Sequence, residues 1–111
     1  MTVARLIQAM ELRLLTPAAD TERAVTGGCV GDLLSFVLAK GEPGMAWITV
    51  QTHLNVIAVA GLHEFSCVIV AENCAVEADT LAKAEEEGIA VLSSPLSSYT
   101  LAGRLYELGV R

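Results

Sequence analysis

The chain is poor in aromatic residues and in positive charge. Aromatic side chains make up 5% of its 111 residues, and 7 Lys and Arg residues stand against 13 Asp and Glu, for a net charge of −6. Nucleic-acid binding needs basic groups that neutralise phosphates, so we expect no nucleic-acid partner. The longest apolar run, residues 56–62, is too short to span a bilayer, so we expect no membrane association either.

Paired cysteines and leader signals are also missing. Cys29, Cys67 and Cys74 are odd in number and form no Cys-x-x-Cys motif, which argues against a disulfide framework and fits a reducing compartment. The N-terminus lacks the basic start and apolar core of a signal peptide. These features predict a cytoplasmic protein.

Apolar residues, by contrast, are abundant. They make up 53% of the chain, above the roughly 45–50% of a typical soluble protein. The surplus of Ala, Val and Leu suits a sheet covered on both faces, or a surface hidden in a partner subunit. The length is that of one domain, so we predict a single domain over residues 1–111.

The apolar periodicity predicts helices that alternate with strands. The predicted helices cover residues 3–10, 29–40, 53–62, 77–87 and 97–108. The predicted strands cover residues 11–15, 46–50, 67–71 and 89–92. In the ambiguous segment 53–62, the β-branched residues favour a strand. We predict a helix there, with Thr52 as its N-cap, because parallel strands need such a crossover.

This order predicts a three-layer α/β/α fold with a four-stranded, mostly parallel sheet. In open sheets of this kind, ligands bind beyond the carboxyl ends of the strands. We expect four loops to meet at this edge. The candidate ligand-binding residues on these loops are Thr26, Gly27, Gly28, Thr52, His53, Asn73 and Ser94.

The Thr26-Gly27-Gly28 segment is the first candidate site. Two glycines before the predicted helix 29–40 would expose backbone N–H groups at its positive end, where a phosphate or carboxylate could bind. The alternative is that the glycines only permit a tight turn and close packing. The chain has neither a P-loop nor a Gly-x-Gly-x-x-Gly dinucleotide motif.

The motifs Thr26-Gly27-Gly28 and Asp32-Leu33-Leu34, together with residues 47–53 and 81–108, resemble the DRTGG domain family over nearly the whole chain. The family is similar to the N-terminal domain of HPr kinase/phosphorylase and to the first domain of some Mur ligases, both three-layer α/β folds. Ala24-Val25 stand where the family name has Asp-Arg, so only Thr26, Gly27 and Gly28 carry over.

The resemblance implies a regulatory or ligand-sensing module that often self-associates and has no established catalysis. Such domains occur beside CBS domains and near hydrogenase and electron-transfer genes. The kinase activity of the HPr enzyme resides in a separate P-loop domain, which this sequence lacks. We therefore expect no kinase activity, and we expect that the chain is not an enzyme.

Other side chains have two interpretations each. His53 is either a proton donor or metal ligand, or a histidine that hydrogen-bonds a nearby loop. Cys29, His53 and Cys74 could converge on a metal, although their spacing matches no known zinc motif. The acidic residues of 77–87 fit a solvated helix face better than acid–base chemistry, and residues 93–98 offer hydroxyls that equally suit a helix cap.

Three functional hypotheses follow. The first is a non-catalytic module that senses a small anionic metabolite or nucleotide at the carboxyl edge of the sheet. The second is a dimeric interaction domain that docks onto a redox or signalling enzyme. The third is a metal-binding or minor enzymatic role. The sequence names no cofactor.

Overall fold

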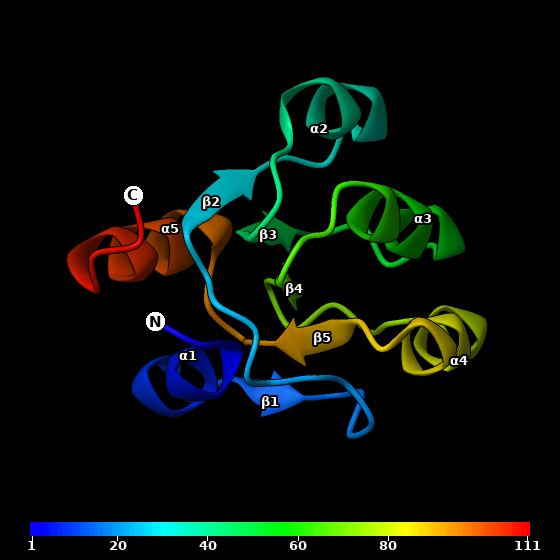
Figure 1. Cartoon of the computed structure of the whole chain (residues 1–111), viewed down its shortest axis with the longest axis horizontal. Helices are drawn as coiled ribbons and strands as arrows, with labels where there is room; N and C mark the ends of the chain where they lie inside the picture. The colour runs from blue at the N-terminus through cyan, green and yellow to red at the C-terminus, as the bar shows by residue number, and fades with distance from the viewer.

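A computed structural model describes all residues 1–111 and shows five helices and five strands (Figure 1). Their order is α1 (Val3–Met10), β1 (Arg13–Leu14), β2 (Gly27–Val30), α2 (Leu34–Lys40), β3 (Met45–Thr49), α3 (Leu54–Leu62), β4 (Cys67–Val70), α4 (Ala78–Glu87), β5 (Ala90–Ser93) and α5 (Ser98–Glu107). The predicted α/β class is therefore confirmed. None of the helices combines the length and apolar character needed to cross a bilayer.

The strands form one mixed sheet in the order β1-β5-β4-β3-β2. Strands β2, β3, β4 and β5 are parallel, and β1 pairs with β5 in the antiparallel direction. The predicted four-stranded sheet is thus wrong in its detail. The sheet has an additional strand, β2. The predicted strand 11–15 is only two residues long, Arg13–Leu14, and forms the antiparallel edge strand β1.

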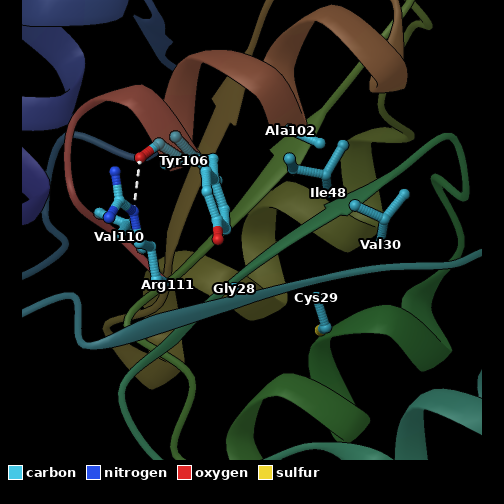
Figure 2. A pocket seen from close by; sticks show the side chains of 9 residues that line it. Gly28, Cys29, Val30, Ile48, Ala102, Tyr106, Val110 and Arg111 are labelled. Carbon is cyan, nitrogen blue, oxygen red and sulfur yellow. Dashed lines mark hydrogen bonds between the residues drawn. The ribbon is translucent and has the colours of Figure 1, made fainter.

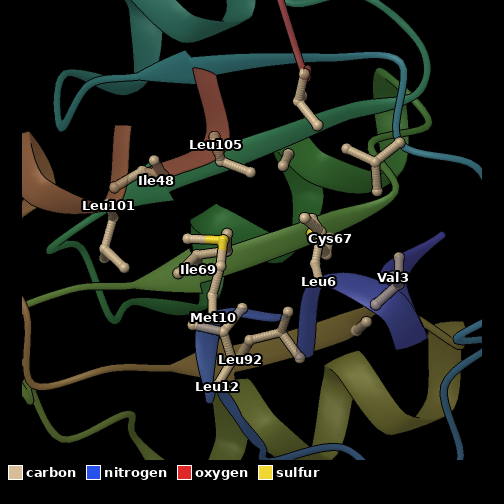
Figure 3. Close-up of a cluster of buried hydrophobic side chains, with 14 of the residues drawn as sticks. Val3, Leu6, Met10, Leu12, Ile48, Cys67, Ile69, Leu92, Leu101 and Leu105 are labelled. Carbon is tan, nitrogen blue, oxygen red and sulfur yellow. The ribbon is translucent and has the colours of Figure 1, made fainter. Parts of the chain in front are cut away.

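Helices cover both faces of the sheet (Figure 1). On one face α1 and α5 bury a core that includes Leu6, Met10 and Leu101 against Ile69 and Leu92 (Figure 3). On the other face α2, α3 and α4 pack over a second core around Trp47. Strands β3 and β4 are buried on both faces, which explains their continuous apolar sequences.

The Thr26-Gly27-Gly28 segment does not open a helix, contrary to the prediction. Gly27 and Gly28 begin β2 and pair with Met45 and Ala46 of β3. Neither glycine has a positive φ angle. Helix α2 starts only at Leu34, since pairing with β3 holds residues 27–30 extended and overrides the helical spacing of their apolar side chains.

The ambiguous segment 53–62 is a helix, as predicted. Helix α3 runs over Leu54–Leu62, and His53 rather than Thr52 is its N-cap residue. The need to connect two parallel strands therefore decides the structure of this segment, although its β-branched residues favour a strand. Helices α1, α4 and α5 also lie close to their predicted ranges. Thr2 and Ser97 accept N-cap hydrogen bonds in α1 and α5, and Gly88 in the left-handed region ends α4.

Candidate functional site

Four of the seven predicted site residues follow the carboxyl ends of parallel strands. Thr52 and His53 follow β3, Asn73 follows β4, and Ser94 follows β5. Because β3, β4 and β5 are parallel neighbours, these four residues lie at one edge of the sheet. The prediction that these four residues meet at the carboxyl edge of the sheet therefore agrees with the fold.

Thr26 and Gly27 lie at the opposite edge. Gly27 starts β2 and pairs with Met45, the first residue of β3, so both mark the amino ends of their strands. The Thr26 N–H donates to the carbonyl of Gly44 at 3.0 Å. The Thr26 side chain packs so close to Gly44 that a Cβ atom at position 44 would lie 2.3 Å from Thr26 Oγ1. This end is closed by structural contacts, and it cannot share a ligand with Asn73.

Ser94 and Thr52 are already used to hold the carboxyl edge together. Ser94 is buried, its Oγ accepts from the Leu96 N–H at 3.1 Å, and its carbonyl accepts from the Asn73 N–H at 2.9 Å. The Thr52 carbonyl accepts from Thr80 Oγ1 at 2.9 Å. Ser94 therefore shapes the edge and does not present its hydroxyl to a ligand.

Asp32 is a member of this edge that was not among the predicted site residues. It follows β2, and its Oδ1 accepts from Thr49 Oγ1 at 2.9 Å and from the Val50 N–H at 2.8 Å. The Gln51 side-chain amide donates to the Asp32 carbonyl at 3.1 Å. These contacts join the ends of β2 and β3 and give Asp32 a structural role.

A hollow of about 290 Å³ opens at the carboxyl ends of β4 and β5, next to the edge strand β1. Its polar lining residues include Arg13, Asn73 and Ser93, and its apolar wall includes Leu15 and Val76. Arg13 pairs with Ser93 across the β1–β5 ladder, so the two side chains lie on the same face of the sheet. The antiparallel direction of β1 is what brings a cation to this edge.

Three polar side chains that line this hollow have no partners within the protein. The Arg13 guanidinium makes no hydrogen bond or ion pair, and the side chains of Asn73 and Ser93 make no hydrogen bond. Arg13 is exposed. A guanidinium is always charged near neutral pH and binds carboxylates and phosphates in a bidentate manner. The hollow therefore presents a free cation beside an amide and a hydroxyl.

Backbone strain accompanies the hollow. Glu72 and Asn73 have φ angles of 60° and 55°, in the left-handed region that L residues rarely adopt. Asn tolerates this region, whereas for Glu it costs about 1–2 kcal/mol. The N–H groups of Glu72 and Asn73 hold the turn by donating to the carbonyls of Leu96 and Ser94, both at 2.9 Å. Such strain concentrates at functional sites.

The cysteines and His53 do not form a metal centre. No group of three or more His, Cys, Asp or Glu side chains lies close enough to hold a metal ion, so Cys29, His53 and Cys74 do not converge. Burial raises the pKa of the Cys29 thiol to about 11 and that of the Cys67 thiol to about 12. Both thiols are therefore protonated and unreactive near neutral pH.

A second hollow, of about 280 Å³, lies between β2 and α5 (Figure 2). Gly28, Val30 and Tyr106 line it, and 7 of its 9 lining residues are hydrophobic. The cationic side chain of this hollow, Arg111, already has partners within the protein. Its Nε donates to the Tyr106 carbonyl at 3.2 Å, and its guanidinium lies 4.6 Å from the Tyr106 ring centre. The Arg13 hollow is therefore the better candidate for an anion.

Comparison with known proteins relates the fold to a regulatory region. No family model and no curated protein matches the chain. The structure is similar to the CBS and DRTGG domains of the regulatory region of Clostridium perfringens pyrophosphatase, which was solved with its activator diadenosine tetraphosphate. The TM-score is 0.70 at 12% sequence identity, over 94% of this chain and 45% of that one.

This similarity shows a DRTGG-like α/β fold. At 12% identity it carries no information about individual residues, and this chain spans less than half of the matched one. The DRTGG resemblance seen in the sequence is thus supported at the level of the fold.

Proposed function

We propose that this chain is a non-catalytic ligand-sensing module that binds a small phosphorylated metabolite or a nucleotide at the carboxyl edge of its sheet. The observation that carries the proposal is the unpaired Arg13 guanidinium, which lies beside Asn73 and Ser93 in the hollow. The arginine recognises a phosphate group, while the amide and hydroxyl orient it.

The size of the hollow limits the part of the ligand that it encloses. A volume of about 290 Å³ lies at the small end of the range for ligand pockets, roughly 300–1,000 Å³. It accommodates a phosphate group and a few further atoms, and the remainder of a nucleotide extends into solvent. The regulatory region with a similar fold binds a nucleotide activator, which supports the same ligand class here.

A thermal-shift series with inorganic phosphate, acetyl phosphate, AMP and diadenosine tetraphosphate tests this proposal. A ligand at one hundred times its dissociation constant stabilises the folded state by about 2.7 kcal/mol. For a domain of this size that raises Tm by roughly 10 °C. Arg13→Ala should abolish the shift, whereas the control Arg5→Ala, on the exposed surface of α1, should retain it. Absence of a shift with all four compounds at millimolar concentration would contradict the proposal.

The second candidate is a dimeric interaction domain that docks onto a larger redox or signalling enzyme. Exposed apolar side chains on the helices of one face favour it. Leu33, the N-cap of α2, is 67% exposed, and Phe36 within α2 is 56% exposed. Leu62 of α3 is 71% exposed. Such side chains commonly mark protein interfaces. Light scattering over a dilution series tests self-association, and a monomer at every concentration would count against this candidate.

A further inference from the structure

Helix α3 is apolar all round, although one of its sides faces solvent. Every residue of Leu54–Leu62 except Asn55 is apolar. Val56, Ile57, Val59 and Ala60 are buried against the sheet. Leu54 and Leu62 are nevertheless 42% and 71% exposed. A helix that is hydrophobic on all sides is normally buried, so a second surface is expected to cover this one.

The position of α3 makes this exposure more unusual. It packs against α2 on one side and α4 on the other, so it is the middle helix of its layer (Figure 1). The outer surfaces of α3 and α4 form a groove of about 500 Å³. The side chains of Leu54, Ala58 and Leu62 line it along α3, together with the backbone of Gly61.

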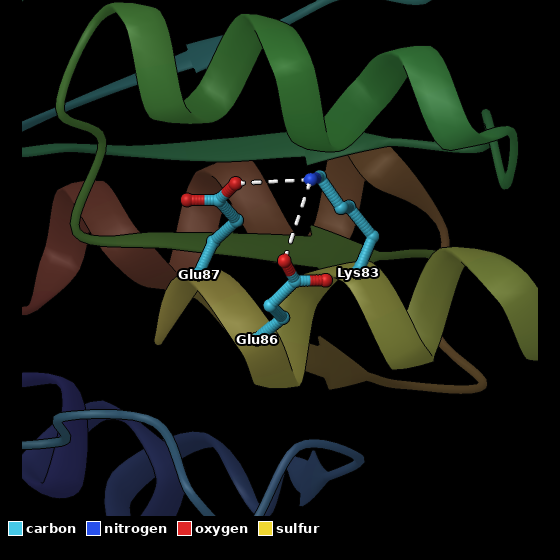
Figure 4. Close-up of polar contacts among 3 residues, drawn as sticks. All are labelled: Lys83, Glu86 and Glu87. Atoms are coloured by element: carbon cyan, nitrogen blue, oxygen red, sulfur yellow. Dashed lines mark ion pairs between the residues drawn. The ribbon is translucent and has the colours of Figure 1, made fainter.

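One rim of the groove carries two opposite charges. Lys83 and Glu87 of α4 line it, and Lys83 Nζ lies 3.2 Å from Glu87 Oε1 and 3.9 Å from Glu86 Oε1 (Figure 4). The hydrogen bond from Lys83 to Glu87 and the charges of Glu86 and Glu87 raise the pKa of Lys83, which is therefore charged at neutral pH. The pair is exposed to solvent, so exchanging one carboxylate partner for another costs little.

We propose that a second copy of this chain occupies the groove, with two α3 helices crossing antiparallel about a two-fold axis. Leu62 of each copy then packs against Ala58 and Gly61 of the other. In the same arrangement Lys83 of each copy faces Glu87 of the other. The inference rests on the second candidate function and names the surface that this function would use.

The charge pattern is what selects a second copy as the occupant. A two-fold interface must be complementary to itself, so each charge on it needs its opposite on the same patch. Lys83 and Glu87 satisfy this condition on one rim, with one turn of α4 between them. A rim of one sign would instead have indicated an oppositely charged partner.

Sedimentation or light scattering over a dilution series up to millimolar chain tests the interface, with two kinds of variant. Leu62→Glu should raise the dimer dissociation constant about thirtyfold or more, because a central apolar anchor is lost. The matched control is Leu108→Glu at the end of α5, on the other face of the sheet, where the replaced leucine is also exposed, at 37%. It should leave the dimer intact. Thermal melts of each variant establish that it remains folded.

Charge reversal gives the sharper readout. Lys83→Glu alone and Glu87→Lys alone should each weaken the dimer about tenfold, because like charges then face each other across the axis. An equimolar mixture of the two variants should restore dimer formation. Within each variant chain positions 83 and 87 carry the same sign, so only pairing between chains can produce this recovery. The control is Arg104→Glu on α5, on the other face of the sheet, which should change nothing.

The possible failures are distinguishable. If the unmodified chain remains monomeric at every concentration, self-association fails, and the inference fails with it. If the chain dimerises but Leu62→Glu and the charge variants leave the dissociation constant unchanged, the groove is not the interface, while the second candidate function survives. Recovery in the mixture together with the effect of Leu62→Glu supports the proposed surface.

Discussion

The two ends of the sheet differ in how completely their polar groups are paired. At the amino end, Thr26 and Gly44 are in tight contact, Thr16 bonds to the backbone of Ile89 and Val91 at the start of β5, and Arg23 donates to the Glu64 carbonyl at 3.1 Å. At the carboxyl end, the Arg13 guanidinium has no protein partner beside a strained turn. Paired groups stabilise the fold, and unpaired groups beside a hollow remain available to a ligand. The predictions below test this difference, in order of decreasing effect on stability.

Gly44→Val should cause the largest loss of stability. Gly44 has φ +84°, and a Cβ atom there would lie 2.3 Å from Thr26 Oγ1. Strain and steric overlap together should lower the free energy of unfolding by about 3 kcal/mol or more, as measured by urea denaturation. Adding Thr26→Ala should recover part of the loss. A loss below about 1 kcal/mol would mean that the amino end is not tightly closed.

Thr16→Val should be the next most damaging change. The Thr16 side chain is fully buried, and its Oγ1 donates to the Ile89 carbonyl at 3.0 Å and accepts from the Val91 N–H at 2.9 Å. Loss of both bonds leaves two buried backbone groups unpaired and should cost about 1–3 kcal/mol in urea denaturation. The control Thr21→Val removes a hydroxyl that makes no hydrogen bond and should be nearly neutral. Equal losses for the two variants would argue against a specific role for Thr16.

Stability should also fall in alkaline solution because of Cys67, the first residue of β4. Burial raises the pKa of this thiol from 9.0 to about 12, so the folded state holds the proton more tightly than the unfolded state does. The contribution of the thiol is complete below pH 9 and is lost as the pH rises from 9 towards 12. The loss amounts to about 1 kcal/mol by pH 10. Cys67→Ala should reduce the slope of the unfolding free energy between pH 8 and 10, and the part that remains is due to Cys29, whose pKa is also raised. An unchanged slope would contradict this assignment.

Gly28→Ala should have the smallest effect. A Cβ atom at position 28 would lie 3.5 Å from the Ala46 carbonyl oxygen and 3.6 Å from Leu105 Cδ1, which are ordinary contacts. The change in unfolding free energy should stay within about 0.5 kcal/mol, and the response to an anion should be unaltered. A loss of anion binding in this variant would restore a functional role to the Gly27-Gly28 pair and would weaken the distinction between the two ends.

The sequence predicts most of the helices because periodicity and capping signals are local. Thr2, Ser97 and Gly88 cap their helices, and the need for a crossover correctly makes residues 54–62 helical. Strand β2 could not be found in this way. Its four residues include two glycines, and only pairing with β3 holds them extended.

The candidate site was predictable only in part, because some of its residues are placed by local sequence patterns and others by strand pairing. Asn73 could be placed because it directly follows a continuous apolar strand. Arg13 could not, because its position depends on the antiparallel direction of a two-residue strand, which is set by pairing with β5. A hydrophobic pattern identifies a strand but does not give the direction of its neighbour. The available signal was an arginine within the predicted strand 11–15, next to apolar Leu12 and Leu14.

The most direct test of the central claim is an amide NMR titration with AMP and inorganic phosphate, comparing the unmodified chain with Arg13→Ala and Arg13→Lys. The proposal predicts saturable shifts at Arg13, Asn73 and Ser93, no shifts at Thr26 and Gly27, and loss of the response in Arg13→Ala. Arg13→Lys should bind more weakly than the unmodified chain, since lysine cannot form a bidentate contact. Saturable shifts that centre on Thr26 and Gly27, or that persist unchanged in Arg13→Ala, would contradict it.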